Sequence, residues 1–415
     1  MEEHLWTGFN KKYSFFIFYL GVLLLPSAFG LATILLLLSS IIGFKNNKKF
    51  FQDKNNIAFC ISSIFMIISC IVQSFNYESS GLTNWETYLS WIGLTNWIPL
   101  YIFSWGFQPY LRKNEHRKRF AIALLAGTFP VLITGIGQVF FDWHGPYNIL
   151  NGFIIWYSRS SENNVLTGLF NNANYAGAWL VIVLPISFAF LVKKENSLKR
   201  FISFIFIVLI ITCIILTNSR SAWIGLLLGS ILFFGSKSLK WIIPIIISLV
   251  ILILFSANND QLQLIPKEAL DEFTNFQYLD RFKIWSQSIR IISSNPIFGS
   301  GAASFSEIYK NNTGLDVFHS HNLIFELAVS YGLPATLFTI IPVILIIKPF
   351  IKKLLFTSNS SDLLIERSLL ISLIIILSMH MVDIQYFDGR ISIAIWLLIA
   401  ALRVLKYRDL KEKNP

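Results

Sequence analysis

Charged residues are scarce in this chain of 415 residues, in which Asp, Glu, Lys and Arg together make up only 14%. Hydrophobic residues make up 54%, and the mean hydropathy is +0.60. A soluble domain carries about 25% charged residues, so this composition excludes an ordinary soluble protein. Apolar runs long enough for a ~30 Å hydrocarbon core recur from Phe15 to Leu405. We expect an all-α multi-pass membrane protein, with one integral membrane domain over residues 1–415.

Cysteines and the common phosphate-binding motifs are also rare or missing. The three cysteines, Cys60, Cys70 and Cys213, all fall inside apolar runs, which excludes a disulfide framework. There is no D-x-D pair, no Cys/His cluster and no Gly-x-x-x-x-Gly-Lys loop, so no bound metal or cofactor is expected. The first apolar run, from Tyr13, lacks a small-residue cleavage site, which favours a retained span over a signal peptide.

The basic residues follow the predicted membrane topology. Twelve spans are expected, at residues 13–26, 28–44, 57–74, 94–111, 119–140, 174–192, 201–217, 221–235, 239–256, 321–347, 367–383 and 390–405. The loops on one side of these spans hold 26 of the 34 Lys and Arg residues. By the positive-inside rule that side is cytoplasmic, with both termini inside. The net charge of +11 therefore reflects topology and does not indicate nucleic acid as a partner.

One outer segment, the large periplasmic loop at residues 257–320, has room for structure of its own. Phe282, Trp285, Ile289 and Ile292 recur in it at spacings of three and four, which predicts an amphipathic helix. The helix should end before Pro296, because proline disfavours helical geometry in the residue before it. We expect this helix to lie on the membrane surface.

Two outer arginines are exceptions to the positive-inside pattern. Arg220 sits in a very short link between two spans, where half-burying a charge costs ~2.5–3.5 kcal/mol on insertion scales. It either binds an anion or extends its charge to the membrane interface. Arg281 either binds an anionic ligand or pairs with Asp280 at the surface. Two guanidinium groups without a carboxylate majority would suit a pyrophosphate, since each donates paired hydrogen bonds.

The histidines before the span at 321–347 are the other candidates. His321 has an unperturbed pKa near operating pH and stands where a polar segment meets an apolar helix, as a general base would. Its alternative role, with Asn322, is to cap that helix. His319 is expected to be a loop or supporting residue. His380 and Asp383 suggest a buried polar pair with a packing role, or a proton path.

Four stretches in order resemble the O-antigen ligase and O-antigen polymerase superfamily of bacterial envelope glycosyltransferases. They are residues 168–177 with Asn174 and Tyr175, residues 217–225 with Arg220, residues 281–301 with Arg281, and residues 319–334 with His319, His321, Asn322, Gly332 and Pro334. The ligase pattern is a histidine, a small polar residue, nine residues and then glycine, which residues 321–332 fit. The resemblance covers roughly residues 165–340.

The resemblance implies a metal-independent, inverting glycosyltransferase in the bacterial inner membrane. His321 would activate the acceptor hydroxyl, and Arg220 and Arg281 would hold the pyrophosphate of a polyprenyl-linked glycan donor. Asn174 and Tyr175 would support the site, together with His319 and Asn322. The acceptor would be a glycan or lipid-linked glycan of a surface polysaccharide.

Two alternatives stay open from the sequence. Ala335 stands third after Gly332, where the ligase pattern prefers glycine, threonine or tyrosine, so ligation and polymerisation are both open. A transporter or flippase of a small anion or lipid-linked sugar is the rival class. It should show broken helices at the midplane and symmetry between halves, and no clear repeat is found.

Overall fold

The computed structural model describes residues 8–47, 49–75, 85–159, 165–193, 196–235, 240, 278–352 and 363–413. These residues are mostly helical, as the composition predicts. The α-helices are α1 Gly8–Leu24, α2 Phe29–Lys45, α3 Lys54–Phe75, α4 Tyr88–Gly93, α5 Ile98–Gly106, α6 Asn114–Phe141, α7 Ala173–Val192, α8 Ser197–Leu216, α9 Arg220–Phe234, α12 Tyr278–Ser294, α13 Phe305–Thr313, α14 Leu323–Phe350, α15 Leu364–Met379 and α16 Gly389–Lys413. A small antiparallel pair, β1 Tyr147–Ile149 and β2 Ile154–Trp156, is an addition to the all-α fold expected.

Five of the described helices are long and apolar enough to cross a membrane: α3, α6, α7, α8 and α14. Shorter apolar helices occupy residues 12–24, α2 and α9. The span expected at residues 239–256 lies outside the described residues, apart from Lys240. A membrane-embedded helical protein is therefore supported, while the count of twelve spans stays a prediction.

The single span expected at residues 94–111 is wrong. These residues form a 3₁₀ turn at Leu94–Asn96, the nine-residue α5 and a second 3₁₀ turn at Gln108–Leu111. Prolines lie at the start of α5 and of the second turn, and proline has no N–H for the helical ladder. Between them Gly106 packs against the backbone of Ser40 in α2, an approach that leaves no room for a side chain.

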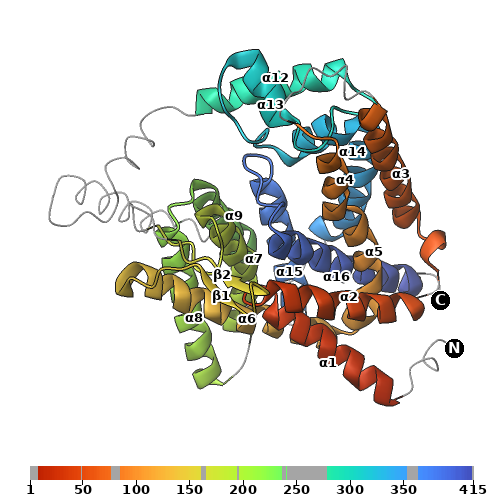
Figure 1. Ribbon diagram of the computed structural model, residues 1–415. Helices are drawn as coiled ribbons and strands as arrows, with labels where there is room; N and C mark the ends of the chain where they lie inside the picture. Colours follow the sequence, from red (N-terminus) through yellow and green to blue (C-terminus); the bar gives the residue numbers. More distant parts are fainter. Residues whose placement is uncertain are drawn as a thin grey trace, which may run out of the picture.

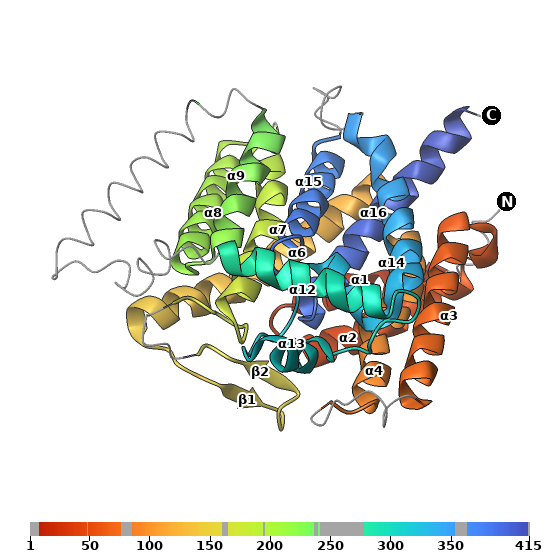
Figure 2. The ribbon, with the colours of Figure 1, turned by 90° about the horizontal axis from the view of Figure 1, so that it is seen from above.

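The helices pack around α7. Its side chains are buried almost all round, which is typical of a helix enclosed by others. It packs against α8, α9 and α15. Figure 2 shows α12 crossing the bundle, with α13, α4 and the β1–β2 hairpin toward one end and the C-terminus toward the opposite end. Figure 1 shows α12 and α13 together above α14, so the two helices of the large loop lie over one part of the bundle.

Two arginines that the sequence assigns to cytoplasmic loops are buried in ion pairs. Arg117 contacts Glu366 at 2.6 Å, with side-chain exposures of 0% and 1%, and joins α6 to α15. Arg403 of α16 contacts Asp53 at 2.8 Å, just before α3. Removing one partner of such a pair leaves an uncompensated buried charge. Some of the basic residues that make the net charge positive therefore hold helices together.

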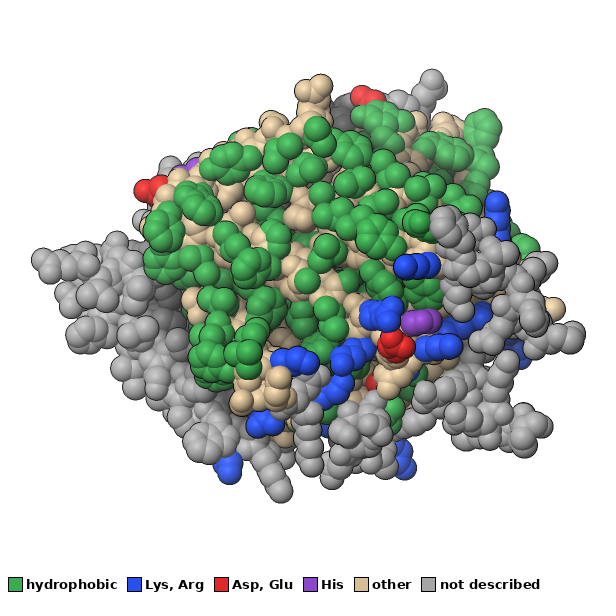
Figure 3. Space-filling model, turned by 90° about the horizontal axis from the view of Figure 1, so that it is seen from below, with side chains coloured by type: hydrophobic (Ala, Val, Ile, Leu, Met, Phe, Trp, Pro, Cys, Tyr) green, Lys and Arg blue, Asp and Glu red, His purple; other side chains and the backbone are tan. Residues whose placement is uncertain are grey.

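The outside of the bundle is apolar. Phe16 of α1, Phe129 of α6 and Phe201 of α8 are 62%, 54% and 59% exposed. Figure 3 shows one face on which apolar side chains cover most of the surface and Lys and Arg gather along one margin. An apolar surface of this extent is typical of a membrane-embedded protein whose outer surface contacts lipid.

The predicted amphipathic helix exists as α12, and it ends at Ser294, before Pro296 as expected. The predicted stripe is divided between two environments. Phe282 and Ile289 are 65% and 52% exposed, whereas Ile292 is 9% exposed and lies in a buried cluster with Ile284 and Ile291. Packing against α14 and α13 buries this part of the helix. The placement of the helix on the membrane surface stays a prediction.

Gly332 interrupts α14 with φ 85°, and the amide of the next residue, Leu333, bonds to the Pro296 carbonyl at 2.8 Å. A Cβ at Gly332 would collide with the Ile297 backbone. We expect Gly332→Ala to destabilise the purified protein by the ~1–3 kcal/mol of a backbone conformation that essentially only glycine adopts, plus about 1–3 kcal/mol for overpacking. Gly314→Ala is the matched control, because Gly314 has φ 76° and nothing within 4 Å. Thermal unfolding of both variants checks this, and equal losses would contradict it.

Candidate active site

Two loops meet at the start of α14. The first, residues 314–322, ends in Asn322, whose side chain caps the helix by accepting from the amides of Ile324 and Phe325 at 3.0 and 3.2 Å. The second, residues 380–388, joins α15 to α16. Asn322 also donates to the Met381 carbonyl at 3.0 Å, and the Leu323 amide bonds to the His380 carbonyl at 2.9 Å. The capping role considered for His321 therefore belongs to Asn322, which at the same time fastens the two loops together.

His321 is held between them by its backbone. Its φ is 52°, in the left-handed region that few non-glycine residues adopt. Such backbones persist only where the surroundings fix them, and they cluster at functional sites. The preceding residue, Ser320, supplies part of that support, because its amide donates to the buried Glu326 carboxylate at 2.8 Å. The conformation presents the His321 side chain, 27% exposed, to the second loop.

The imidazole of His321 meets the carboxylate of Asp383. Nδ1 of His321 lies 3.0 Å from Oδ1 of Asp383. The other carboxylate oxygen accepts from Asn174 at 3.2 Å and from Gln385 at 3.0 Å. Gln385 in turn lies 3.2 Å from Nδ1 of the buried His380. These contacts give the carboxylate one orientation, with Oδ1 left for His321.

The charge state of Asp383 determines which ring nitrogen of His321 carries the proton. Burial opposes ionisation of Asp383, but the hydrogen bond from His321 and the electrostatic influence of His321 and Arg281 outweigh it and hold the pKa of Asp383 below its ordinary value. An ionised carboxylate only accepts hydrogen bonds, so Nδ1 of His321 must donate. Nε2 is then the basic nitrogen, and it has no hydrogen bond among the described residues.

His319 lies beside this pair and stays neutral. Its ring centroid is 4.2 Å from that of His321, and its Nδ1 accepts the backbone N–H of His321 at 3.2 Å. Burial, followed by the neighbouring His321, lowers the pKa of His319 to about 4. The neutral ring of His319 accepts a hydrogen bond from the backbone of His321 and so helps to position that residue.

Arg281 reaches the same loops from α12. Its guanidinium donates to the backbone carbonyl of Val382, directly before Asp383. Its positive charge acts on Asp383 and on His319, so all three groups share one electrostatic environment. Arg281 therefore reaches the loop that carries Asp383, the partner of His321.

Arg220 is the first residue of α9 and follows a tight turn in which Asn218 has φ 51°. This turn packs on Gly177 of α7, where an added Cβ would touch Ser219. Gly177 lies one helical turn after Asn174, the residue that bonds to Asp383. No direct contact between Arg220 and His321 is found among the described residues.

The remaining predicted residues lie in the first turns of α7. Asn174 contacts Asp383 directly, as described above. Tyr175 interacts electrostatically with Asp383, Asp388 and Arg390. Asp388 and Arg390 form a buried pair at 2.5 Å, which also fixes the start of α16.

Sequence reasoning missed the role of Asp383, which it placed in a span beside His380. The helix ends at Met379, so Asp383 lies in a loop and reaches His321 across 62 residues of sequence. The signal was a carboxylate at the same expected membrane face as the candidate base, which commonly needs an acidic partner.

The same side chains include a possible metal-binding set. His319, His321 and Asp383 each offer a ligand atom, and these atoms lie within 4.8 Å of one another. Two imidazoles and a carboxylate are ligands that zinc accepts. It is the one such group among the residues that the structure describes.

The arrangement can accept a proton. Asp383 orients His321 and would stabilise the imidazolium that forms, and the Arg281 guanidinium bonds to the residue before Asp383. A hydroxyl group placed beside Nε2 of His321 could lose its proton as it attacks an electrophile with an anionic leaving group.

Comparison with protein families gives a match over part of the chain. Residues 205–340 match the family model described as O-antigen ligase. That range contains Arg220, Arg281, His319 and His321, whereas Asp383 and Asn174 lie outside it. No curated protein matches the chain significantly.

Proposed function

Because residues 205–340 identify this chain as a member of the O-antigen ligase and polymerase superfamily, we propose that it transfers a glycan from a polyprenyl pyrophosphate donor to an acceptor hydroxyl. The reaction takes place at the periplasmic face of the bacterial inner membrane and serves surface polysaccharide assembly. The observation that carries the proposal is the His321–Asp383 pair beside Arg281.

The proposed reaction is a single displacement. Nε2 of His321 accepts the proton of the acceptor hydroxyl while its oxygen attacks the anomeric carbon of the donor sugar. The bond from that carbon to the pyrophosphate oxygen breaks, and the electron pair leaves with the polyprenyl pyrophosphate. Attack opposite to the leaving group inverts the anomeric configuration. Asp383 balances the positive charge gained by His321.

The leaving pyrophosphate needs positive charge near the lipid surface. Arg281 and Arg220 are proposed to supply it, since a guanidinium donates paired hydrogen bonds to phosphate oxygens. Arg281 belongs to the same loop junction as the base, and Arg220 begins α9 behind the first turns of α7. The apolar outer surface of the bundle suits a polyprenyl chain that stays in the bilayer.

The test is turnover by the purified protein in detergent, without a membrane gradient. A polyprenyl pyrophosphate-linked oligosaccharide and a glycan acceptor should yield free polyprenyl pyrophosphate and a product of inverted anomeric configuration. Movement of the lipid-linked sugar across proteoliposomes without cleavage would instead support the transporter alternative. The acceptor distinguishes the two enzyme types: a second copy of the lipid-linked repeat indicates a polymerase, and a lipid-anchored core glycan a ligase.

We expect turnover to be independent of metal ions. Several ligand atoms of the histidine and aspartate set already have hydrogen-bond partners: Nδ1 of His319 accepts from the His321 backbone, and the oxygens of Asp383 accept from His321, Asn174 and Gln385. Dialysis against EDTA should therefore leave the rate unchanged within about twofold, a negligible free-energy difference. Loss of turnover that is restored by zinc or manganese would contradict the proposal.

A further inference from the structure

A second polar cavity lies along α12, away from the histidine pair. Its volume is about 650 Å³, within the ~300–1,000 Å³ range of ligand sites. Its walls come from the C-terminal half of α12, from α13, from residues 295–300 and from the end of α3. The proposed mechanism uses none of these walls.

Amide side chains dominate the lining. Five of the ten lining residues are Asn or Gln: Gln73, Gln287, Asn295, Asn311 and Asn312. Ser294 and Ser300 add hydroxyl groups, and only Ile291 and Ile308 are apolar. An amide offers an acceptor oxygen and two N–H donors, which matches sugar hydroxyls that both donate and accept. A lipid chain would require a mostly apolar lining, which this cavity lacks.

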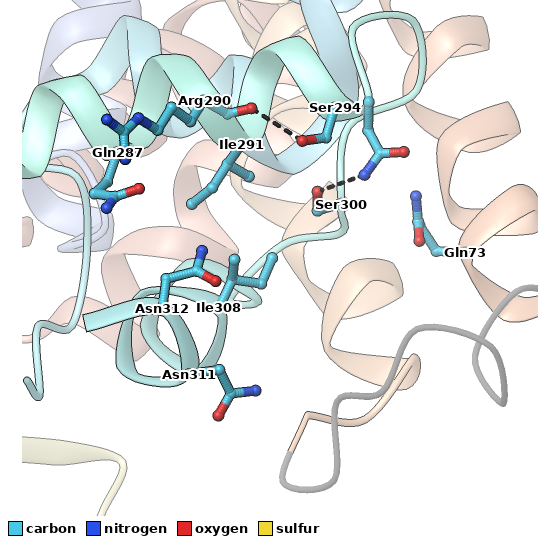
Figure 4. Close-up of a pocket in the computed structure, with 10 residues that line it drawn as sticks. Gln73, Gln287, Arg290, Ile291, Ser294, Ser300, Ile308, Asn311 and Asn312 are labelled. Carbon is cyan, nitrogen blue, oxygen red and sulfur yellow. Dashed lines mark hydrogen bonds between the residues drawn. The ribbon is translucent and has the colours of Figure 1, made fainter. Parts of the chain in front are cut away.

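Part of the lining is held in place, and part is available to a ligand. Nε2 of Gln73 donates to the Gly299 carbonyl at 2.6 Å, and Asn295 donates to Ser300 at 3.2 Å. In the part of the chain that the structure describes, the side chains of Gln287, Asn311 and Asn312 make no hydrogen bond. Figure 4 shows Asn312 on α13 pointing toward the α12 side of the cavity, where Gln287 and Arg290 lie together.

Arg290 gives the cavity positive charge. Among the described residues that line the cavity none is acidic, and the Arg290 guanidinium has no ion-pair partner in the described part of the chain. A guanidinium among amides suits a sugar that carries a carboxylate, because it binds the carboxylate with two parallel hydrogen bonds. Neutral sugars would leave this charge without a partner.

The position relative to the reaction follows from helix geometry. Arg290 is nine residues after Arg281 on α12, which is about 14 Å along the axis and about two and a half turns, so the two side chains leave opposite sides of the helix. Arg281 contacts the loop that carries Asp383. A glycan whose end reacts at His321 would therefore pass around α12 to enter the cavity.

We propose that this cavity is a glycan subsite that binds an acidic sugar, such as a hexuronate, several residues from the reacting end of the donor or acceptor chain. The inference rests on the proposed glycan transfer. Arg290 binds the carboxylate, and the amides of Gln287, Asn311 and Asn312 bind hydroxyl groups. The subsite selects the glycan, whereas the His321–Asp383 pair does the chemistry.

The first experiment measures binding without turnover. A lipid-free oligosaccharide that contains glucuronate and its glucose-containing counterpart are titrated by calorimetry against the purified full-length protein. The protein should bind the acidic form at least tenfold more tightly, about 1.4 kcal/mol. Arg290→Gln should abolish that preference, whereas Lys283→Gln, which removes one charge from the same helix outside the cavity, should retain it. Equal affinity for both sugars, or a preference that survives Arg290→Gln, would overturn the subsite.

The second experiment separates the donor from the acceptor and this inference from the proposed function. Arg290→Gln should raise KM for the substrate whose chain occupies the cavity and leave kcat within about twofold, because it removes binding remote from the reacting atoms. A higher donor KM assigns the cavity to the donor chain, and a higher acceptor KM to the acceptor. Unchanged KM values for both would overturn the subsite. If the protein binds the acidic sugar but turns over no lipid-linked glycan, the proposed transferase function is refuted and the subsite is retained.

Discussion

Replacing His321 with glutamine is expected to lower glycan transfer by roughly 10²–10⁴-fold, the usual contribution of a positioned general base. Glutamine keeps a polar side chain of similar reach but cannot accept a proton near neutral pH. The loss should appear in kcat, because the base acts only as the hydroxyl attacks. It is measured as release of polyprenyl pyrophosphate by the purified variant.

His319→Gln is the matched control. His319 shares the loop and lies against His321, and it contributes a hydrogen bond to the backbone and no proton transfer. We expect about a tenfold loss or less, since one such bond is worth ~0.5–1.5 kcal/mol. Thermal unfolding should show both variants folded. If the two substitutions cost equally, or if His321→Gln keeps more than a tenth of the activity, His321 is not the base.

Much of the fold could be predicted because a bilayer restricts the choices. Apolar runs have to become helices, so the positions of α3, α6, α7 and α14 follow from hydropathy. The interrupted segment at residues 94–111 could not be predicted this way, since its prolines and Gly106 act through packing against α2. The spacing of the apolar residues predicts the helix α12, but only its packing neighbours determine that Ile292 is buried while Phe282 and Ile289 stay exposed.

The candidate site was predictable where the chemistry lies within one motif. His321, Asn322 and His319 stand together in the sequence, and their boundary position indicated a site. Asp383 was not predictable from its own neighbours, because its nearest ionisable residue in sequence, His380, bonds to Gln385 instead. The fastening of two loops by Asn322 brings Asp383 to His321.

Arg117 and Arg403 illustrate a second limit. Counting basic residues treats each as a topological signal, whereas the structure buries both in ion pairs. A count of charged residues uses only their sign and their position in the sequence. The acidic partners, Glu366 and Asp53, lie far away in sequence and near the ends of other helices, so their pairing depends on how the helices pack in the bundle.

Asp383→Asn should cost nearly as much as the loss of His321 itself, on the order of 10³–10⁴-fold in kcat, by analogy with the aspartate of hydrolase triads. The amide that replaces the carboxylate carries no charge to stabilise the imidazolium. It can also present N–H donors to Nδ1, which would move the ring proton to Nε2 and remove the base. Asn174 and Gln385 favour this wrong orientation, because both donate to Oδ2 and would hold the amide oxygen there, turning its NH₂ toward His321.

Asp316→Asn is the charge-matched control for this variant, because Asp316 pairs with Lys310 at an exposed position and should be nearly neutral. Asp383→Glu should recover part of the activity, since it restores an ionised acceptor at a shifted distance. A structural role would lower the unfolding temperature of Asp383→Asn and leave kcat per folded molecule intact. A catalytic role predicts the reverse: a folded protein with donor KM almost unchanged and kcat lost. If Asp383→Asn lowers the unfolding temperature and leaves kcat intact, His321 acts without Asp383. The main support for the proposed mechanism is then lost.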